Sequence, residues 1–229
     1  MIILGDTHAE WKMLNHEIDT YLRGDHIKKN KTLDIIVCGD FGYWPNFEKY
    51  SLDKINTYGG RVQIYFCPGN HENWWSLPKT NEITEVHENI FYCPFGSTKK
   101  FNGNNILFCG GAESTDKNVR SIGYDWFPEE VISLQDMENL PKNNIDPIDV
   151  VISHTYPKII EEKLRVEWLY TNKNNDPSCK LLDYVFNMYN PKLWIFGHLH
   201  VSRTINYEGT KFVCLNQIGE KGYRMILGE

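Results

Sequence analysis

Short apolar runs recur along the chain, and each has the length and composition of a buried β-strand. Such strands are about four to eight residues long and are rich in β-branched and aromatic side chains. Between the first two runs, apolar positions from Trp11 to Leu22 repeat at helical spacing. Strands that alternate with helices predict βαβ units and a parallel sheet. The runs are Met1–Leu4, Leu33–Cys38, Val62–Cys67, Ile106–Cys109, Val150–Ser153 and Leu193–Phe196.

Other segments carry helix and hairpin signals. The pattern over Phe47–Tyr58 predicts a helix that Gly59-Gly60 ends, and further helices are expected after Pro128-Glu129-Glu130 and after Asp176-Pro177. Two-residue turns with glycine flanked by apolar runs predict hairpins. The segments involved are Ile90–Cys93, Thr98–Phe101 and Ile106–Cys109 in the middle, and Arg203–Tyr207 with Lys211–Leu215 near the end. The Asn/Lys-rich Thr171–Asn175 is expected to be an exposed loop.

Composition narrows the class of protein. The chain has 229 residues, of which 41% are hydrophobic, and we expect residues 1–229 to form a single domain with a substantial core. The formal charge of -6 argues against an extended nucleic-acid-binding surface. We find neither a long apolar span nor a secretory signal, and the six cysteines are scattered singly, as buried thiols are. A cytoplasmic location is therefore expected.

Five polar motifs share one position, because each directly follows a predicted strand. Strands that run in one direction have their carboxyl ends along one edge of a sheet, so motifs far apart in sequence can converge there. A glycine before the polar residue allows a sharp turn out of the strand. The motifs are Gly5-Asp6-Thr7-His8, Gly39-Asp40, Gly69-Asn70-His71-Glu72, Ser153-His154 and Gly197-His198-Leu199-His200.

The converging side chains are carboxylates, imidazoles and a carboxamide, a set that suits manganese, iron, zinc or nickel. More than four such ligands imply two ions. Two cations about 3.5 to 4 Å apart can deprotonate a bridging water and hold a phosphoester for in-line attack. Taken singly each motif is weak, since Asp6 alone could cap a helix. His16, His26 and His87 lack partners in the pattern and are expected at the surface.

As an ordered set, these motifs resemble the calcineurin-like metallophosphoesterase superfamily over Gly5 to His200. The resemblance implies an α/β fold in which a β-sandwich is flanked by helices in four layers. It also implies two divalent ions, with manganese the foremost candidate. One ion would take Asp6, His8 and His200, and the other Asn70, His154 and His198. Asp40 would bridge both ions.

The resemblance gives His71 a catalytic role outside the metal ligands. It would donate a hydrogen bond to a phosphoryl or leaving-group oxygen, and Glu72 or a backbone carbonyl could orient it. The second motif continues as Gly-Asp-Phe-Gly-Tyr-Trp and lacks the phosphate-binding arginine of the protein Ser/Thr phosphatase branch. The segment Gly110–Asp116, followed by Arg120 and Trp126, resembles loops of small bacterial and phage members.

Several residues beside the motifs are candidates for substrate binding. Trp44 and Trp74 could stack a nucleobase, or they could pack a loop onto the domain. Arg120 could clamp a phosphate, or it could be an exposed arginine near Asp116 and Glu113. The function expected is hydrolysis of a phosphomonoester or phosphodiester, with a nucleotide or oligonucleotide as a candidate substrate. A protein phosphatase, a nuclease subunit and a non-catalytic scaffold of the same fold are the alternatives.

Overall fold

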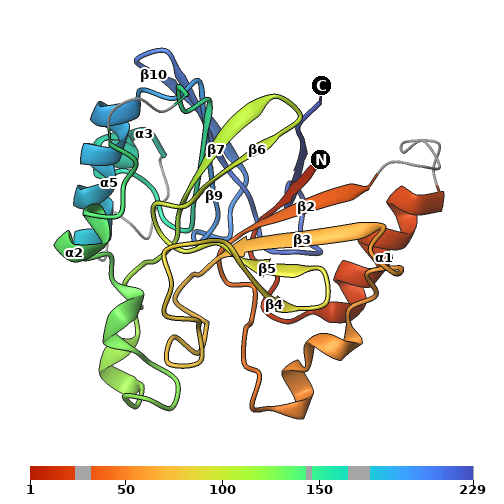
Figure 1. Ribbon diagram of the computed structural model, residues 1–229. Helices are drawn as coiled ribbons and strands as arrows, with labels where there is room; N and C mark the ends of the chain where they lie inside the picture. The colour runs from red at the N-terminus through yellow and green to blue at the C-terminus, as the bar shows by residue number, and fades with distance from the viewer. Residues whose placement is uncertain (24–31, 143–145, 165–175, 229) are drawn as a thin grey trace.

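Two six-stranded sheets face each other and form a sandwich in the computed structural model, which describes residues 1–23, 32–142, 146–164 and 176–228 (Figure 1). One sheet has the order β12-β1-β2-β3-β5-β4 and the other β10-β11-β9-β8-β7-β6. In the first, β1, β2, β3 and β5 are parallel, with β12 and β4 antiparallel at the edges. The second repeats this plan with β7, β8, β9 and β11 parallel.

The strands of the first sheet are β1 (Ile2–Leu4), β2 (Leu33–Cys38), β3 (Val62–Cys67), β4 (Thr84–His87), β5 (Ile90–Tyr92) and β12 (Arg224–Ile226). Those of the second are β6 (Thr98–Phe101), β7 (Asn104–Cys109), β8 (Val150–Ser153), β9 (Leu193–Phe196), β10 (Arg203–Tyr207) and β11 (Thr210–Cys214). The six predicted apolar strands and both predicted hairpins, β6–β7 and β10–β11, are confirmed.

Along each strand, alternate side chains point to opposite faces of the sheet and so contribute to different layers of the core. Ile3, Ile36 and Ile195 point between the sheets into a shared core, while their neighbours point outward. On the outer face of the first sheet, Leu4 and Val37 pack with helix α1 (Trp11–Arg23). On the outer face of the second, a core that contains Trp194 packs with α5 (Pro177–Tyr189). The helix–sheet–sheet–helix arrangement is the predicted four-layer fold.

Two predicted helices are much shorter than expected. Over Phe47–Tyr58 the chain forms only the 3₁₀ turns η1 (Glu48–Tyr50) and η2 (Leu52–Lys54). After Pro128 it forms the 3₁₀ turn η4 (Pro128–Glu130) and the four-residue α2 (Leu134–Met137), which begins at a capping box on Ser133. The first segment lies beside the strand ends, where its aromatic side chains contact one another and do not line up on one helical face.

The remaining short elements are η3 (Lys117–Val119), η5 (Lys158–Ile160) and α3 (Glu161–Leu164). Strands β4 and β12 were not predicted, because short edge strands with polar residues lack an apolar run. The expected loop Thr171–Asn175 and His26 lie outside the described residues. His16 is exposed, but His87 is half-buried in β4 and contacts Asp53, so its expected lack of a partner was wrong. All six cysteines are buried thiols, as expected.

None of the helices in the described ranges has the length and apolar character needed to cross a bilayer.

Candidate active site

The carboxyl ends of the central strands from both sheets meet at one end of the sandwich. Asp6 follows β1, Asp40 follows β2, His154 follows β8 and His198 follows β9. Four residues here have left-handed backbone conformations, which cost about 1 to 3 kcal/mol each for residues other than glycine. They are His8, Asp40, His198 and His200, with φ of 46°, 44°, 64° and 48°. The fold sustains this strain at the point where the motifs converge.

One group of donor atoms consists of Asp6, His8, Asp40 and His200, whose ligand atoms all lie within 4.8 Å of one another. His200 Nε2 is 3.0 Å from an Asp6 carboxylate oxygen and 3.0 Å from His8 Nε2. His8 Nε2 is also 3.8 Å from Asp40 Oδ2. Metal–ligand distances of about 2.0 to 2.2 Å place donors of one ion about 3 to 4.4 Å apart, so these spacings suit a single cation.

A second group surrounds His154, which is fully buried. Its Nε2 lies 2.9 Å from Asn70 Oδ1, 3.3 Å from Asp40 Oδ1 and 3.2 Å from His198 Nδ1. Its other ring nitrogen is 3.0 Å from the carbonyl oxygen of Cys38, to which it donates. This bond fixes the ring with Nε2 toward the site, as backbone carbonyls do for metal-ligating histidines. Asp40 thus contributes one oxygen to each group.

The pKa values in the cluster depend on the pairing of the two buried carboxylates with the imidazole of His154. Burial lowers the pKa of His154, but the carboxylates of Asp40 and Asp6 outweigh burial and raise it to about 10. Burial, together with the charge on His154, lowers the pKa of His198 to about 3. Burial acts to raise the pKa of Asp40, yet His154 and His71 hold it well below its usual range. A divalent cation would replace the proton on His154, because metal ligands must be deprotonated.

The residues present therefore fit two cations, one in each donor group, which share Asp40. When bound, such cations lower the pKa of water and neutralise phosphoryl oxygens. The protein holds the acidic donors rigidly by backbone hydrogen bonds. The His198 N–H donates to both oxygens of Asp6, at 3.1 and 3.0 Å, and the His71 N–H donates to Asp40 Oδ1 at 2.9 Å.

Glycines in the motifs leave space for the candidate ligands. This role is more specific than the sharp turn that we predicted. A Cβ built on Gly197 would lie 2.0 Å from Asp6 Oδ1, and one on Gly69 would lie 2.2 Å from Asp40 Oδ1. A Cβ on Gly39 would meet the His154 ring at 2.2 Å. Each glycine therefore faces a candidate ligand from a different strand, and hydrogen is the only side chain that fits there.

A polar chain behind the cluster orients the amide of Asn70. Its Nδ2 donates to the hydroxyl of Ser114 at 3.3 Å, which leaves Oδ1 facing His154. The Ser114 N–H donates to Oε1 of the buried Glu130, which also accepts from the Trp126 indole at 3.0 Å. Burial raises the pKa of Glu130 to about 7, although hydrogen bonds from Ser114 and Trp126 oppose that shift. Neither Ser114 nor Glu130 was singled out in the sequence, where they look like ordinary loop residues.

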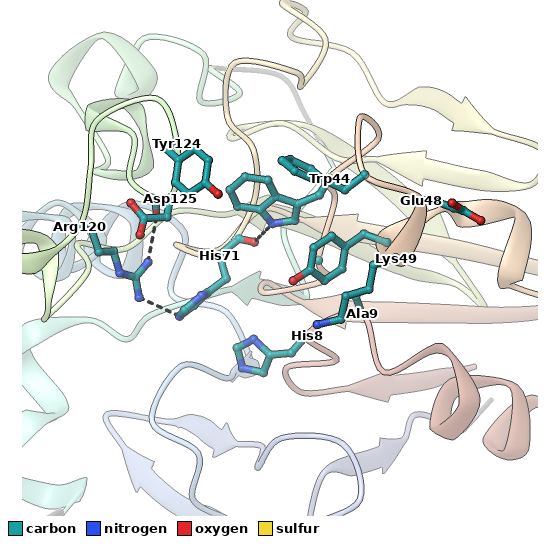
Figure 2. Close-up of a pocket in the computed structure, with 12 residues that line it drawn as sticks. His8, Ala9, Trp44, Glu48, Lys49, His71, Arg120, Tyr124 and Asp125 are labelled. Carbon is teal, nitrogen blue, oxygen red and sulfur yellow. Dashed lines mark hydrogen bonds between the residues drawn. The ribbon is translucent and has the colours of Figure 1, made fainter.

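His71 lies beside the cluster, with its ring centre 5.1 Å from that of His8. Arg120 donates to His71 Nε2 at 3.2 Å, and the Trp44 indole N–H donates to the His71 carbonyl at 2.7 Å (Figure 2). Burial lowers the pKa of His71, and the charge on Arg120 adds to this, while Asp40 opposes it. Glu72, one of the two groups that we expected to orient the ring, bonds elsewhere. Its buried carboxylate accepts the N–H groups of Gly42 and Gly69 and so joins two loops.

A cavity of about 670 Å³ opens beside His8 and His71. Arg120 and Trp44 line it, as Figure 2 shows, but Trp74 does not. The Trp74 indole donates to the carbonyl of Gly69, and its ring packs against the core of the first sheet and lines a separate cavity. The remaining lining comes largely from two loops, at residues 47–50 and 124–125.

A sandwich of two mixed sheets with carboxylate and histidine donors at the strand ends defines a metal-dependent phosphoesterase. A model of the calcineurin-like phosphoesterase family matches residues 1–202. The chain therefore belongs to the calcineurin-like phosphoesterases, as the order of its motifs indicated.

Among curated proteins, the chain is similar to two lariat debranching enzymes. It is 28% identical to that of Entamoeba histolytica over 249 residues, which covers 96% of this chain and 69% of the relative. It is 25% identical to that of Schizosaccharomyces pombe over 207 residues, which covers 77% of this chain and 44% of the relative. The chain thus spans about two thirds of one relative and less than half of the other.

Solved structures show the same fold at lower identity. A phosphopantetheinyl hydrolase from Mycobacterium tuberculosis aligns with a TM-score of 0.58 at 15% identity, covering 99% of this chain and 96% of that one. A putative 5′-nucleotidase from Staphylococcus aureus aligns with a TM-score of 0.51 at 15% identity, covering 95% of this chain and 48% of that one. At this identity the likeness is one of fold.

We expect Gly197→Ala to weaken metal binding, because the added methyl group would displace the Asp6 carboxylate. Manganese affinity, measured by titration, should fall about 10- to 100-fold, as when an orienting partner is lost. Gly228→Ala is the matched control, since a Cβ there meets no described atom within 4 Å. Equal manganese affinity in the two variants would contradict this use of the glycine.

We expect Ser114→Ala to weaken one of two metal positions, because the Asn70 amide would no longer be held with its oxygen toward His154. Titration with manganese should show one ion bound as in the wild type and the other about 10- to 100-fold more weakly. Ser97→Ala removes another buried hydroxyl, which donates to the carbonyl of Pro94, and should change neither. Equal weakening of both ions would show that Ser114 supports the fold and not Asn70.

Proposed function

We propose that this protein uses two divalent cations, manganese foremost, to hydrolyse a phosphodiester bond in a nucleotide or short oligonucleotide. The observation that carries the proposal is the shared carboxylate of Asp40. One of its oxygens faces each donor group, at 3.8 Å from His8 and 3.3 Å from His154. A carboxylate placed between two sets of donors suits a pair of cations, and paired cations suit phosphoester hydrolysis.

The charges beside the cluster favour a diester over a dianionic monoester. Arg120 donates to His71, but its Nε is 2.7 Å from Asp116 and its side chain is 11% exposed. Its charge is therefore largely compensated, and the chain lacks an arginine after Gly39-Asp40. A monoester carries a second negative charge, and such a site offers little to stabilise it. A diester carries only one negative charge and therefore does not need that stabilisation.

His71 and Arg120 line the cavity, where both could bind oxygens of the ester. Because Arg120 donates to Nε2 of His71, the neutral ring carries its proton on Nδ1. A phosphoryl oxygen that enters the cavity competes for the Arg120 N–H and frees Nε2, which would take up the proton given off by the attacking water and donate it to the leaving-group oxygen as the ester bond breaks. His71 thus acts on the phosphoryl or leaving-group oxygen, and Trp44 holds it in place through the backbone carbonyl.

The similarity to two lariat debranching enzymes supports the choice of a nucleotide ester. The net charge of -6 argues against an extended nucleic-acid-binding surface on the protein, which agrees with a small substrate. Complete donor groups favour an enzyme over the scaffold, and the missing arginine disfavours a protein phosphatase. A cytoplasmic location stays a prediction.

We expect two manganese ions per chain and metal-dependent cleavage of bis(p-nitrophenyl) phosphate at a rate at least comparable to that of p-nitrophenyl phosphate. Asp40→Asn should lower the occupancy of both ions, because a neutral amide bridges two cations poorly. Elemental analysis and initial rates measure these outcomes. A chain that binds no manganese and cleaves neither ester would refute the proposal, and cleavage of the monoester alone would refute its diester part.

We expect His71→Ala to lower kcat by about 10² to 10⁴ while the manganese content stays near that of the wild type, because His71 moves a proton and holds no metal. His198→Ala, in contrast, removes a candidate ligand and should lose one ion. Parallel measurements of kcat and bound manganese separate the two roles. Loss of metal from the His71 variant equal to that from the His198 variant would assign His71 to the metal.

A further inference from the structure

Two aromatic side chains at the cavity are exposed to water. Tyr124 is 70% exposed and Phe47 is 43% exposed, yet both line the cavity that contains His8 and His71. Large aromatic rings gain free energy when their faces are covered, so exposed rings in a concave site favour a planar apolar ligand. They come from different loops, one after β2 and one after β7.

Trp44, for which sequence analysis left stacking on a base and packing of a loop both open, is only partly exposed and already contacts other side chains. Its indole N–H donates to His71, and its ring centre is 5.9 Å from that of Phe127, which is 1% exposed. It also contacts Phe47 and Tyr50, at centre distances of 6.0 and 6.4 Å. Trp44 therefore supports Phe47 and Tyr50 from below while it also lines the cavity.

The loop that carries Tyr124 is held in place without a ligand. The Gly123 N–H donates to the Trp126 carbonyl at 2.8 Å, and a Cβ on Gly123 would meet the Trp75 ring at 2.3 Å. Arg120 donates to the carbonyl of Asp125 at 3.3 Å as well as to His71, so one side chain joins this loop to the reaction site (Figure 2). A ring on this loop keeps its distance from the metal cluster, which reduces the entropy cost of binding.

We propose that Phe47 and Tyr124 form a nucleobase subsite, so that the substrate is a nucleotide diester whose base lies against these rings while its phosphate reaches the metal cluster. The inference rests on the proposed function for the phosphate and on the exposed rings for the base. It names residues that the sequence did not single out, and it gives Trp44 a supporting role.

The charged side chains at the same rim favour a ligand with few phosphates. Glu48 and Asp125 are carboxylates, and the Lys49 ammonium lies over the Tyr50 ring, 5.1 Å from its centre. Carboxylates repel further phosphates but can accept hydrogen bonds from the amino groups of adenine, cytosine or guanine. The lining holds two acids, one lysine and Arg120, which is already paired with Asp116, so it suits one or two nucleotides and disfavours a long polyanion.

The test compares a dinucleoside monophosphate that carries two adenines with the same diester lacking both bases. With manganese-loaded protein, Tyr124→Ala and Phe47→Ala should each raise KM for the adenine diester about tenfold, equivalent to about 1.4 kcal/mol. KM for the baseless diester should not change. Tyr124→Phe keeps the ring and should behave as the wild type. Tyr184→Ala removes a tyrosine of similar exposure, 64%, from α5 and is the matched control.

A binding measurement separates this inference from the proposed function. Adenosine carries no phosphate, so its affinity, measured by calorimetry, reports on the rings alone, and Tyr124→Ala should weaken it about tenfold. Binding of adenosine that depends on Tyr124, without cleavage of any diester, would support the subsite and refute the proposed function. Cleavage of both diesters with equal KM, unchanged by either alanine variant, would refute the subsite and leave the proposed function standing.

Discussion

The structure depends on two buried carboxylates, Asp6 and Asp40, that meet a buried histidine at the junction of two sheets. Carboxylates that are 0% and 1% exposed are costly to desolvate unless opposite charges and hydrogen bonds compensate them. His154 supplies part of that compensation, and backbone N–H groups of His71 and His198 supply more. Cations would complete it. The fold thus concentrates negative charge where a metal ion gains the most from it.

That concentration is achieved by the way the sheets come together. Asp6 and Asp40 leave the first sheet, whereas His154 and His198 leave the second, so each donor group requires both sheets in register. The shared core between the sheets fixes this register, and the glycines beside the ligands let the strand ends approach to contact. Disturbing the packing of either sheet would therefore move the ligands relative to one another, because the ligands follow closely after the strands.

Chemistry and recognition are assigned to different parts of the chain. Strand ends hold the donors, while loops at residues 47–50 and 120–125 contribute most of the wall of the cavity. Arg120 links the two, since it is paired with Asp116 on one side and donates to His71 on the other. Loops tolerate change better than strands do, so a single reaction centre can be fitted with different substrate walls. In our proposal, the exposed rings of this wall select the substrate.

The sequence by itself determined the central strands, both hairpins and the order of the donor motifs, because burial and glycine turns leave strong local signals. Buried runs such as Ile35–Cys38 have no other stable environment than a covered sheet. Ser114, Glu130 and Tyr124 left no such signal, since their roles arise from contacts across loops. The segment 47–58 has a helical pattern of apolar residues, but its aromatic side chains pack on Trp44 and the chain forms only 3₁₀ turns. Only the tertiary structure could decide these points, because the partner that gives each side chain its role is distant in the sequence.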